Sequence, residues 1–169
     1  VNIDLGENLD GELAIGTVRI HQGALTAAQV QNNYNEEAVR FAKLPVVGAP
    51  APIHRYAFND AGNPGLDSIA GANATLTGAA AIVNGQLDLT GGFASLPLGN
   101  EINTYTNATF ETWFTFRGGG NWQRVFDLGT DTNNYAFLTP QSGDNTTYFE
   151  IKSPPSGVLR ASTGTAPLN

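Results

Sequence analysis

The chain has 169 residues, no cysteine and a formal net charge of −7. This length suits a single ordinary domain, and the absence of cysteine excludes disulfides and thiolate metal sites. Only 14% of the residues are charged, against roughly 25% in an average soluble domain. Lys and Arg form no cluster, so nucleic acid is not an expected partner, and no apolar run approaches the ~18 residues of a membrane span.

The first predicted elements are a strand and a helix. Residues 14–21 (AIGTVRIH) alternate in polarity, which predicts a strand with four side chains on one face: Ile15, Thr17, Arg19 and His21. Thr26 and Gln29 have the spacing of a capping box, so we expect a helix from about Ala27. Residues 43–52 (KLPVVGAPAP) contain three prolines and a glycine, which predicts a linker.

From residue 53 onward, short strand-like runs follow one another, separated by Gly, Pro and Asn. Asn84–Gly85 is a strong signal for a two-residue hairpin turn. Many short strands with closely spaced turns indicate an all-β, antiparallel β-sandwich of jelly-roll type, with one short helix. Abundant Gly, Asn and Thr with little charge is typical of extracellular all-β proteins, so we expect a secreted protein.

Residues 106–130 (TNATFETWFTFRGGGNWQRVFDLGT) predict two strands around a glycine turn. In the first strand, one face carries Phe110, Thr112, Phe114 and Phe116, and the other carries Glu111, Trp113, Thr115 and Arg117. In the second, Trp122, Arg124, Phe126 and Leu128 alternate with Gln123, Val125 and Asp127. Arg124 and Asp127 then point to opposite faces, and a direct ion pair between them would require a bulge.

These two strands resemble the early strands of laminin G-like domains, the concanavalin A-like jelly rolls common in large bacterial surface proteins. HRYAFNDAGNPGLDSIAGANATLTG resembles the opening of that family, and NYAFLTP and YFEIK resemble the next strands. LAIGTVRIHQGALTAAQVQNNY resembles instead the closing strand and terminal helix. The resemblance covers residues 1–42 and about 53–160, but its two parts stand in reverse order and the family's middle is missing.

The reversed order allows three arrangements. Residues 1–42 can end one domain while residues 53–169 begin the next, so that the chain is a window cut from tandem repeats. Residues 1–42 of one copy can instead complete residues 53–169 of a neighbour and build a filament, because unpaired edges attract strands. In the third arrangement, the two pieces pair within one chain. We rank these arrangements in that order.

Catalysis is not expected from the sequence. Glycoside hydrolysis needs a pair of nearby carboxylates, whereas Glu111 has no acidic neighbour and is expected to be solvated. Asp127 is expected to end its strand and order the following turn. The two histidines, His21 and His54, match no metal or catalytic motif and are expected at strand ends on the surface.

The candidate ligand-binding residues are Trp113, Trp122 and Arg124, since indole rings can stack on sugars. A structural role explains them equally well, the tryptophans as packing residues of the sandwich. The resemblance implies calcium at a loop rim, and residues 59–68 (NDAGNPGLDS) offer Asp60, Asn63 and Asp67 as oxygen ligands; residues 131–134 (DTNN) form a second oxygen-rich loop. The alternative for both loops is an Asx-turn, in which such side chains cap their own backbone.

The resemblance implies a non-catalytic extracellular or cell-surface module that binds glycans or proteins, without nucleic acid and without a membrane span. The first alternative is a filament subunit that self-associates through residues 1–42 and 53–169 of neighbouring copies. A weaker alternative is an accessory module of a polysaccharide-degrading enzyme. The sequence names neither the ligand nor the number of flanking domains.

Overall fold

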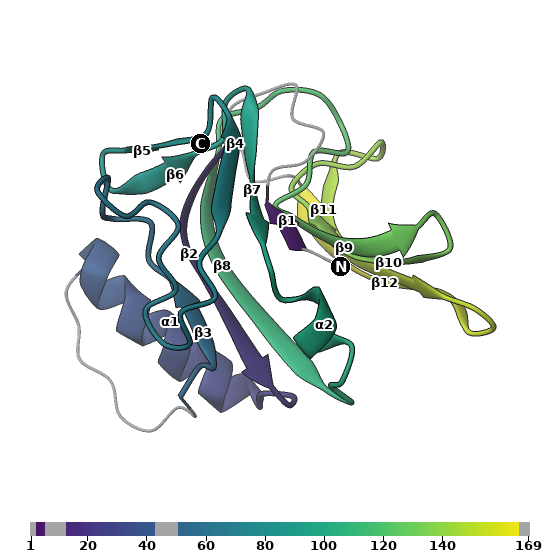
Figure 1. Cartoon of the computed structure of the whole chain (residues 1–169). Helices are drawn as coiled ribbons and strands as arrows, with labels where there is room; N and C mark the ends of the chain where they lie inside the picture. Colours follow the sequence, from purple (N-terminus) through teal and green to yellow (C-terminus); the bar gives the residue numbers. More distant parts are fainter. Residues whose placement is uncertain (1–2, 6–12, 43–50, 166–169) are drawn as a thin grey trace.

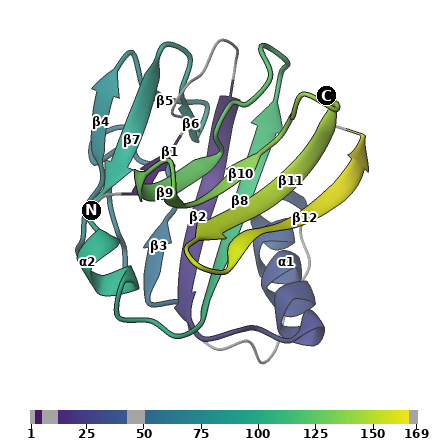
Figure 2. The same ribbon diagram turned by 90° about the vertical axis from the view of Figure 1, so that its right-hand side faces the viewer.

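The computed structural model describes residues 3–5, 13–42 and 51–165, and it forms two antiparallel sheets packed face to face (Figures 1 and 2). This confirms the expected all-β sandwich with a short helix. The seven-stranded sheet has the order β12-β11-β10-β9-β1-β7-β4. The five-stranded sheet has the order β3-β2-β6-β5, and β8 pairs with the free side of β2.

The elements have the following bounds: β1 (Ile3–Leu5), β2 (Leu13–Gln22), α1 (Ala27–Ala42), β3 (His54–Tyr56), β4 (Thr75–Gly78), β5 (Ala81–Val83), β6 (Gln86–Asp88), β7 (Gly92–Leu96), α2 (Gly99–Ile102), β8 (Ala108–Phe116), β9 (Phe126–Asp131), β10 (Asn134–Thr139), β11 (Thr146–Ser153) and β12 (Gly157–Thr165).

The segments before and after the predicted linker share one hydrophobic core. β1 lies between β7 and β9, and β2 is the central strand of the five-stranded sheet. Ile3, Leu5 and Ile15 are fully buried together with Tyr56 and Leu87. The early strands therefore pair with the later ones inside one chain, which is the arrangement that the sequence analysis ranked last.

A β-bulge in β2 changes which side chains face the core. The pairing of β2 with β8 shifts register between Ile15 and Thr17, at Gly16. Ile15 therefore joins Val18 and Ile20 in the core, whereas Thr17 and the polar residues after it face the other way. The prediction that Ile15 lies on the same face as Thr17 is wrong, because an extra residue in a strand reverses the alternation beyond it.

Helix α1 begins where the capping signal predicts. The Thr26 amide donates to Gln29 Oε1 at 2.8 Å, and the Gln29 amide donates to Thr26 Oγ1 at 3.3 Å, so both halves of the capping box form. The helix lies against the outer face of the five-stranded sheet (Figure 1). The Asn84–Gly85 hairpin between β5 and β6 is also confirmed: the two residues have φ angles of 51° and 73°, as a type I′ turn requires.

The second strand of the 106–130 region is shorter than expected. β9 begins at Phe126, and the chain from Trp122 to Val125 runs irregularly. Trp122 has a φ of 70°, an uncommon conformation for a residue with a Cβ. Asp127 lies near the start of β9, opposite Asp4 and Phe137, so the expectation that it ends the strand was wrong.

Candidate functional site

The outer face of the seven-stranded sheet carries a row of charged and aromatic side chains. Antiparallel pairing sets them side by side across five strands, in the order Asp4, Asp127, Phe137, Glu150 and Arg160. Their neighbours along each strand point inward, because side chains alternate; Ile3 and Phe126, for example, lie in the core. The row therefore faces away from the core.

A pocket of about 640 Å³ lies on this face. Its lining combines aromatic rings with charged groups, among them Trp122, Arg124, Asp127, Tyr135, Phe137 and Glu150. Trp122 is 44% exposed, and its ring meets Tyr148 edge-on at 5.6 Å. Tyr135 and Phe137 stack at 5.6 Å. The pocket thus offers the exposed Trp122 ring to a ligand, whereas Phe137 and Glu150 lie almost fully buried at its base.

Arg124 contacts three other residues that line this pocket. Its Nε donates to Asp127 Oδ2 at 3.0 Å, and a terminal nitrogen donates to the Trp122 carbonyl at 3.0 Å. The guanidinium also lies 3.6 Å from the centre of the Phe137 ring, a cation–π contact. Trp122 and Arg124 therefore come together as candidate ligand-binding residues. The ion pair between Arg124 and Asp127, which was expected to require a bulge, forms because Arg124 precedes the regular strand β9.

Glu150 is held by two donors from neighbouring strands. Tyr135 donates its hydroxyl to Oε1 at 2.7 Å, and Arg160 donates Nε to Oε2 at 2.7 Å. Burial alone would raise the pKa of Glu150, but these bonds outweigh it and lower the pKa. Burial raises the pKa of Asp127, despite the attraction of Arg124, and the charge of Asp4 raises it further.

Each carboxylate in the row already has a partner: Asp4 bonds to Ser95, Asp127 to Arg124, and Glu150 to Tyr135 and Arg160. Carboxylates held in this way can accept further hydrogen bonds from the hydroxyl groups of a ligand in a fixed geometry.

No family model, curated protein or solved structure matches this chain. The resemblance to laminin G-like domains therefore stays a prediction. None of the described helices is long and apolar enough to cross a membrane.

The other candidate tryptophan lies outside this pocket. Trp113 is on β8, and its ring stacks on Tyr34 of α1 with centroids 4.9 Å apart. It lines a separate groove on the five-stranded sheet. The structure thus brings together two of the three predicted ligand-binding residues. Tyr135, Phe137 and Glu150 were not predicted as site residues, although the alternation in NYAFLT and TTYFEIKS sets aromatic and charged residues on one strand face.

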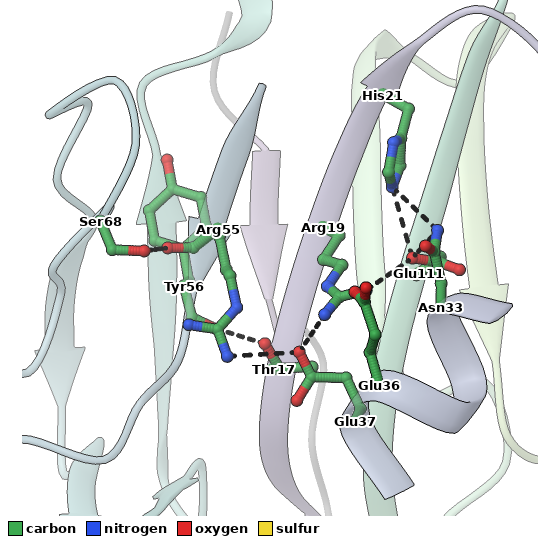
Figure 3. A network of polar contacts seen from close by, with 10 residues as sticks. All are labelled: Thr17, Arg19, His21, Asn33, Glu36, Glu37, Arg55, Tyr56, Ser68 and Glu111. Atoms are coloured by element: carbon green, nitrogen blue, oxygen red, sulfur yellow. Dashed lines mark hydrogen bonds and ion pairs between the residues drawn. The ribbon is translucent and has the colours of Figure 1, made fainter. Parts of the chain in front are cut away.

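A buried polar network lies between α1 and the five-stranded sheet (Figure 3). Arg19 contacts Glu37 Oε1 at 2.6 Å, and Arg55 reaches the same oxygen at 3.3 Å. Glu111 accepts from Asn33 at 2.8 Å and lies 3.3 Å from His21 Nε2. These contacts fix the helix on the sheet.

This network overturns two sequence expectations. Glu111 was expected in solvent, but its side chain is only 13% exposed. His21 was expected on the surface, yet it is buried. Both lie on the sheet face that α1 covers, so the helix removes them from water, and buried polar groups need the partners that they find here.

His54 is buried as well and connects β3 to α2. Its Nδ1 lies 2.7 Å from Asp67 Oδ2, and its Nε2 lies 3.1 Å from Glu101 Oε2. Both ring nitrogens of His54 therefore lie within hydrogen-bond distance of a carboxylate. Asp67 also accepts from the amides of Arg55, Ile69 and Ala72. The expectation that His54 lies on the surface was wrong, since Asp67 and Glu101 enclose its ring.

The predicted calcium ligands have other roles in the described structure. Asp67 points inward to His54, with no exposed side-chain surface. Asp60 lies on the surface and accepts the Gly62 amide at 2.8 Å, and the Asn63 amide donates to the Asp60 carbonyl. In the second loop, Asp131 accepts the Asn133 amide at 2.6 Å. Asp60 and Asp131 thus form Asx-turns.

Within the described ranges, no group of three or more His, Cys, Asp or Glu residues is arranged to hold a metal ion. Both carboxylate oxygens of Asp67 and Oδ1 of Asp60 already accept hydrogen bonds from the protein's own donors. Calcium at Asp60, Asn63 and Asp67 stays a prediction of the family resemblance.

Proposed function

We propose that this chain is a non-catalytic extracellular module that binds glycans on the outer face of its seven-stranded sheet. The observation that carries this proposal is the pocket that unites Trp122, Tyr135 and Phe137 with Arg124 and Glu150. Binding sites combine apolar surface with a few precisely placed polar groups. A sugar ring presents both chemistries, since its C–H face packs on an aromatic ring while its hydroxyl groups bond to charged side chains.

The charges of the pocket favour a neutral glycan. Arg124 lies in the pocket with its charge balanced by Asp127, which weakens its attraction for an acidic sugar. The protein also carries a net charge of −7, which repels polyanions at low salt. Uncharged polysaccharides remain the class that fits.

Replacing Trp122 with Ala is expected to weaken binding at least tenfold, because the exposed indole supplies the most accessible ring of the pocket. Calorimetric titration with a panel of neutral polysaccharides, such as laminarin, galactomannan and soluble starch, measures the affinity. Trp113→Phe is the matched control, since Trp113 lies in another groove, and its affinity should equal that of the wild type. Melting temperatures of both variants check the fold.

The proposal is overturned if the wild type binds none of these polysaccharides. It is equally overturned if Trp122→Ala keeps full affinity, or if Trp113→Phe alone loses it. If the ligand is instead an extracellular protein, the Trp122→Ala variant should still bind that protein.

A second candidate function is a filament subunit built by exchange of the early strands. The observation that favours it is the insertion of β1 and β2 as interior strands in the two sheets, because a neighbouring copy can supply the same contacts. Light scattering tests it: a filament grows without limit as concentration rises, and deletion of residues 1–42 abolishes growth. Species no larger than two copies would rule it out.

A further inference from the structure

A further pocket, of about 540 Å³, lies between the two sheets beside α2. One wall is the inner face of the seven-stranded sheet, where Ile3, Leu128 and Ile151 line it. The other wall comes from α2 and the start of β8, through Ile102 and Phe110. Figure 1 shows the β9–β10 and β11–β12 hairpins projecting beyond α2 and β8. We call this pocket the inner pocket, and the pocket around Trp122 the outer pocket.

The floor of the inner pocket belongs to a continuous apolar row. Antiparallel pairing sets five side chains next to one another on β1, β9, β10, β11 and β12, in the order Ile3, Leu128, Ala136, Ile151 and Leu159. Their exposure rises along the row: Ile3 is 1% exposed, Ile151 is 38% exposed and Leu159 is 65% exposed. The row therefore begins in the core and ends as an open apolar surface.

The inner pocket adjoins the outer pocket. Gly129, Thr130 and Tyr135 line both of them. These residues lie where β9 and β10 approach their common turn, and Gly129 pairs with Tyr135 across the two strands. The outer pocket occupies the outer face of the sheet at this place and the inner pocket occupies the inner face, so the two meet around the turn. One ligand with a polar part and an apolar part can therefore fill both.

We propose that the ligand is a single molecule of a neutral glycolipid, with its sugar head group in the outer pocket and its alkyl chain in the inner pocket. This inference rests on the proposed glycan binding and adds the apolar part of the ligand. An alkyl chain has no hydrogen-bonding groups, so it covers the apolar row without leaving a polar atom unpaired. A further stretch of polysaccharide or a peptide would bury polar groups against Leu128 and Ile151, which is costly.

The length of the row indicates the length of the chain. Leu128 and Leu159 are three strand spacings apart, which corresponds to about 14 Å. An extended alkyl chain advances about 1.3 Å per carbon, given a C–C bond of about 1.5 Å. A chain of roughly ten carbons therefore reaches from the end of β9 to the exposed end of the row, and it removes Ile151 and Leu159 from water.

Calorimetric titration with pairs of glycosides tests this inference. The probes are the methyl and decyl glycosides of glucose, galactose and mannose, with the decyl compounds kept below the concentration at which they form micelles. The wild type is expected to bind at least one decyl glycoside at least tenfold more tightly than its methyl counterpart, because each methylene group removed from water favours binding about fourfold. Trp122→Ala should weaken binding of both members of that pair by the same factor.

A variant of the pocket floor locates the alkyl chain. Ile151→Asn places a polar group beneath the chain and should abolish the advantage of the decyl glycoside, while the affinity for the methyl glycoside stays unchanged. Val158→Asn is the matched control: Val158 is 49% exposed, pairs with Lys152 on the opposite face of the hairpin and lines neither pocket. Its variant should keep the full advantage. Melting temperatures of both variants check the fold.

Equal affinity for the two members of every pair would overturn the inference, as would the absence of measurable binding. An advantage of the decyl glycoside that survives Ile151→Asn, or that Val158→Asn abolishes, would overturn it as well. If neutral polysaccharides still bind through Trp122 in these cases, the proposed glycan binding stands without a glycolipid. If the decyl chain binds through Ile151 while Trp122→Ala changes no affinity, the site takes hydrocarbon alone and both proposals fail.

Discussion

Replacing Arg19 with Met is expected to destabilise the protein by about 3–5 kcal/mol, the cost of removing one partner from a buried ion pair. Arg19 is 5% exposed and Glu37 is 2% exposed. Without the 2.6 Å contact of Arg19, Glu37 keeps only the longer contact with Arg55, and a buried carboxylate with so little compensation is costly. Urea denaturation at pH 7 measures the loss.

Two further variants locate the cause of this effect. Arg117→Met removes an arginine from the 3.5 Å contact with Asp88, where the Arg117 side chain is 39% exposed, and should cost no more than about 1 kcal/mol. The double variant Arg19→Met with Glu37→Met should recover part of the loss, because it removes the stranded charge. Arg19→Met within 1 kcal/mol of the wild type would show that the network does not hold α1.

Asp67→Asn is expected to cost about 3 kcal/mol at neutral pH, because the amide turns a donor toward groups that already donate. His54 and the three backbone amides lower the pKa of Asp67 against the opposing effect of its burial. A carboxyl group whose pKa is lower in the folded chain stabilises the fold above its unfolded pKa, near 3.8. This contribution is lost as the pH falls through the folded pKa.

The difference in free energy of unfolding between the wild type and Asp67→Asn should therefore be largest at pH 7 and become smaller below about pH 4. Urea midpoints across this range measure it. Asp60→Asn is the control from the same loop: Asp60 is exposed and caps only the Gly62 amide, so its variant should stay within about 1 kcal/mol of the wild type. A constant gap down to pH 3 would contradict the role given to Asp67.

Local signals in the sequence predicted local structure well. The Asn84–Gly85 turn and the Thr26–Gln29 capping box depend on neighbouring residues alone, and both form. The alternation of β8 also holds: Phe110 and Phe114 pack toward the core, while Glu111 faces α1. The bulge was missed, although Gly16 inside a strand is a recognised sign of one.

The polar interior could not be predicted from local patterns. His21 and Glu111 lie on adjacent strands that are far apart in the sequence, and they are buried only because α1 covers that face. His54 is enclosed by Asp67 and by Glu101 of α2. Whether a polar side chain is solvated depends on which element covers it, and sequence periodicity does not contain that information.

The face that we propose to bind glycans was predicted only in part for the same reason. Trp122 and Arg124 were named as aromatic and basic residues in one short stretch. Their partners Tyr135, Phe137 and Glu150 come from two further strands, and the pairing registers of β9, β10 and β11 bring them together.

The central position of β2 has a consequence for synthesis on the ribosome. Its partner β8 is made much later: the contact between Gly23 and Thr109 spans 86 residues, which takes roughly 4–17 s to translate at bacterial and eukaryotic speeds. During that delay β2 and α1 have emerged, but the strand that closes their sheet has not. Nascent chains should therefore depend on chaperones until residues 108–116 leave the exit tunnel.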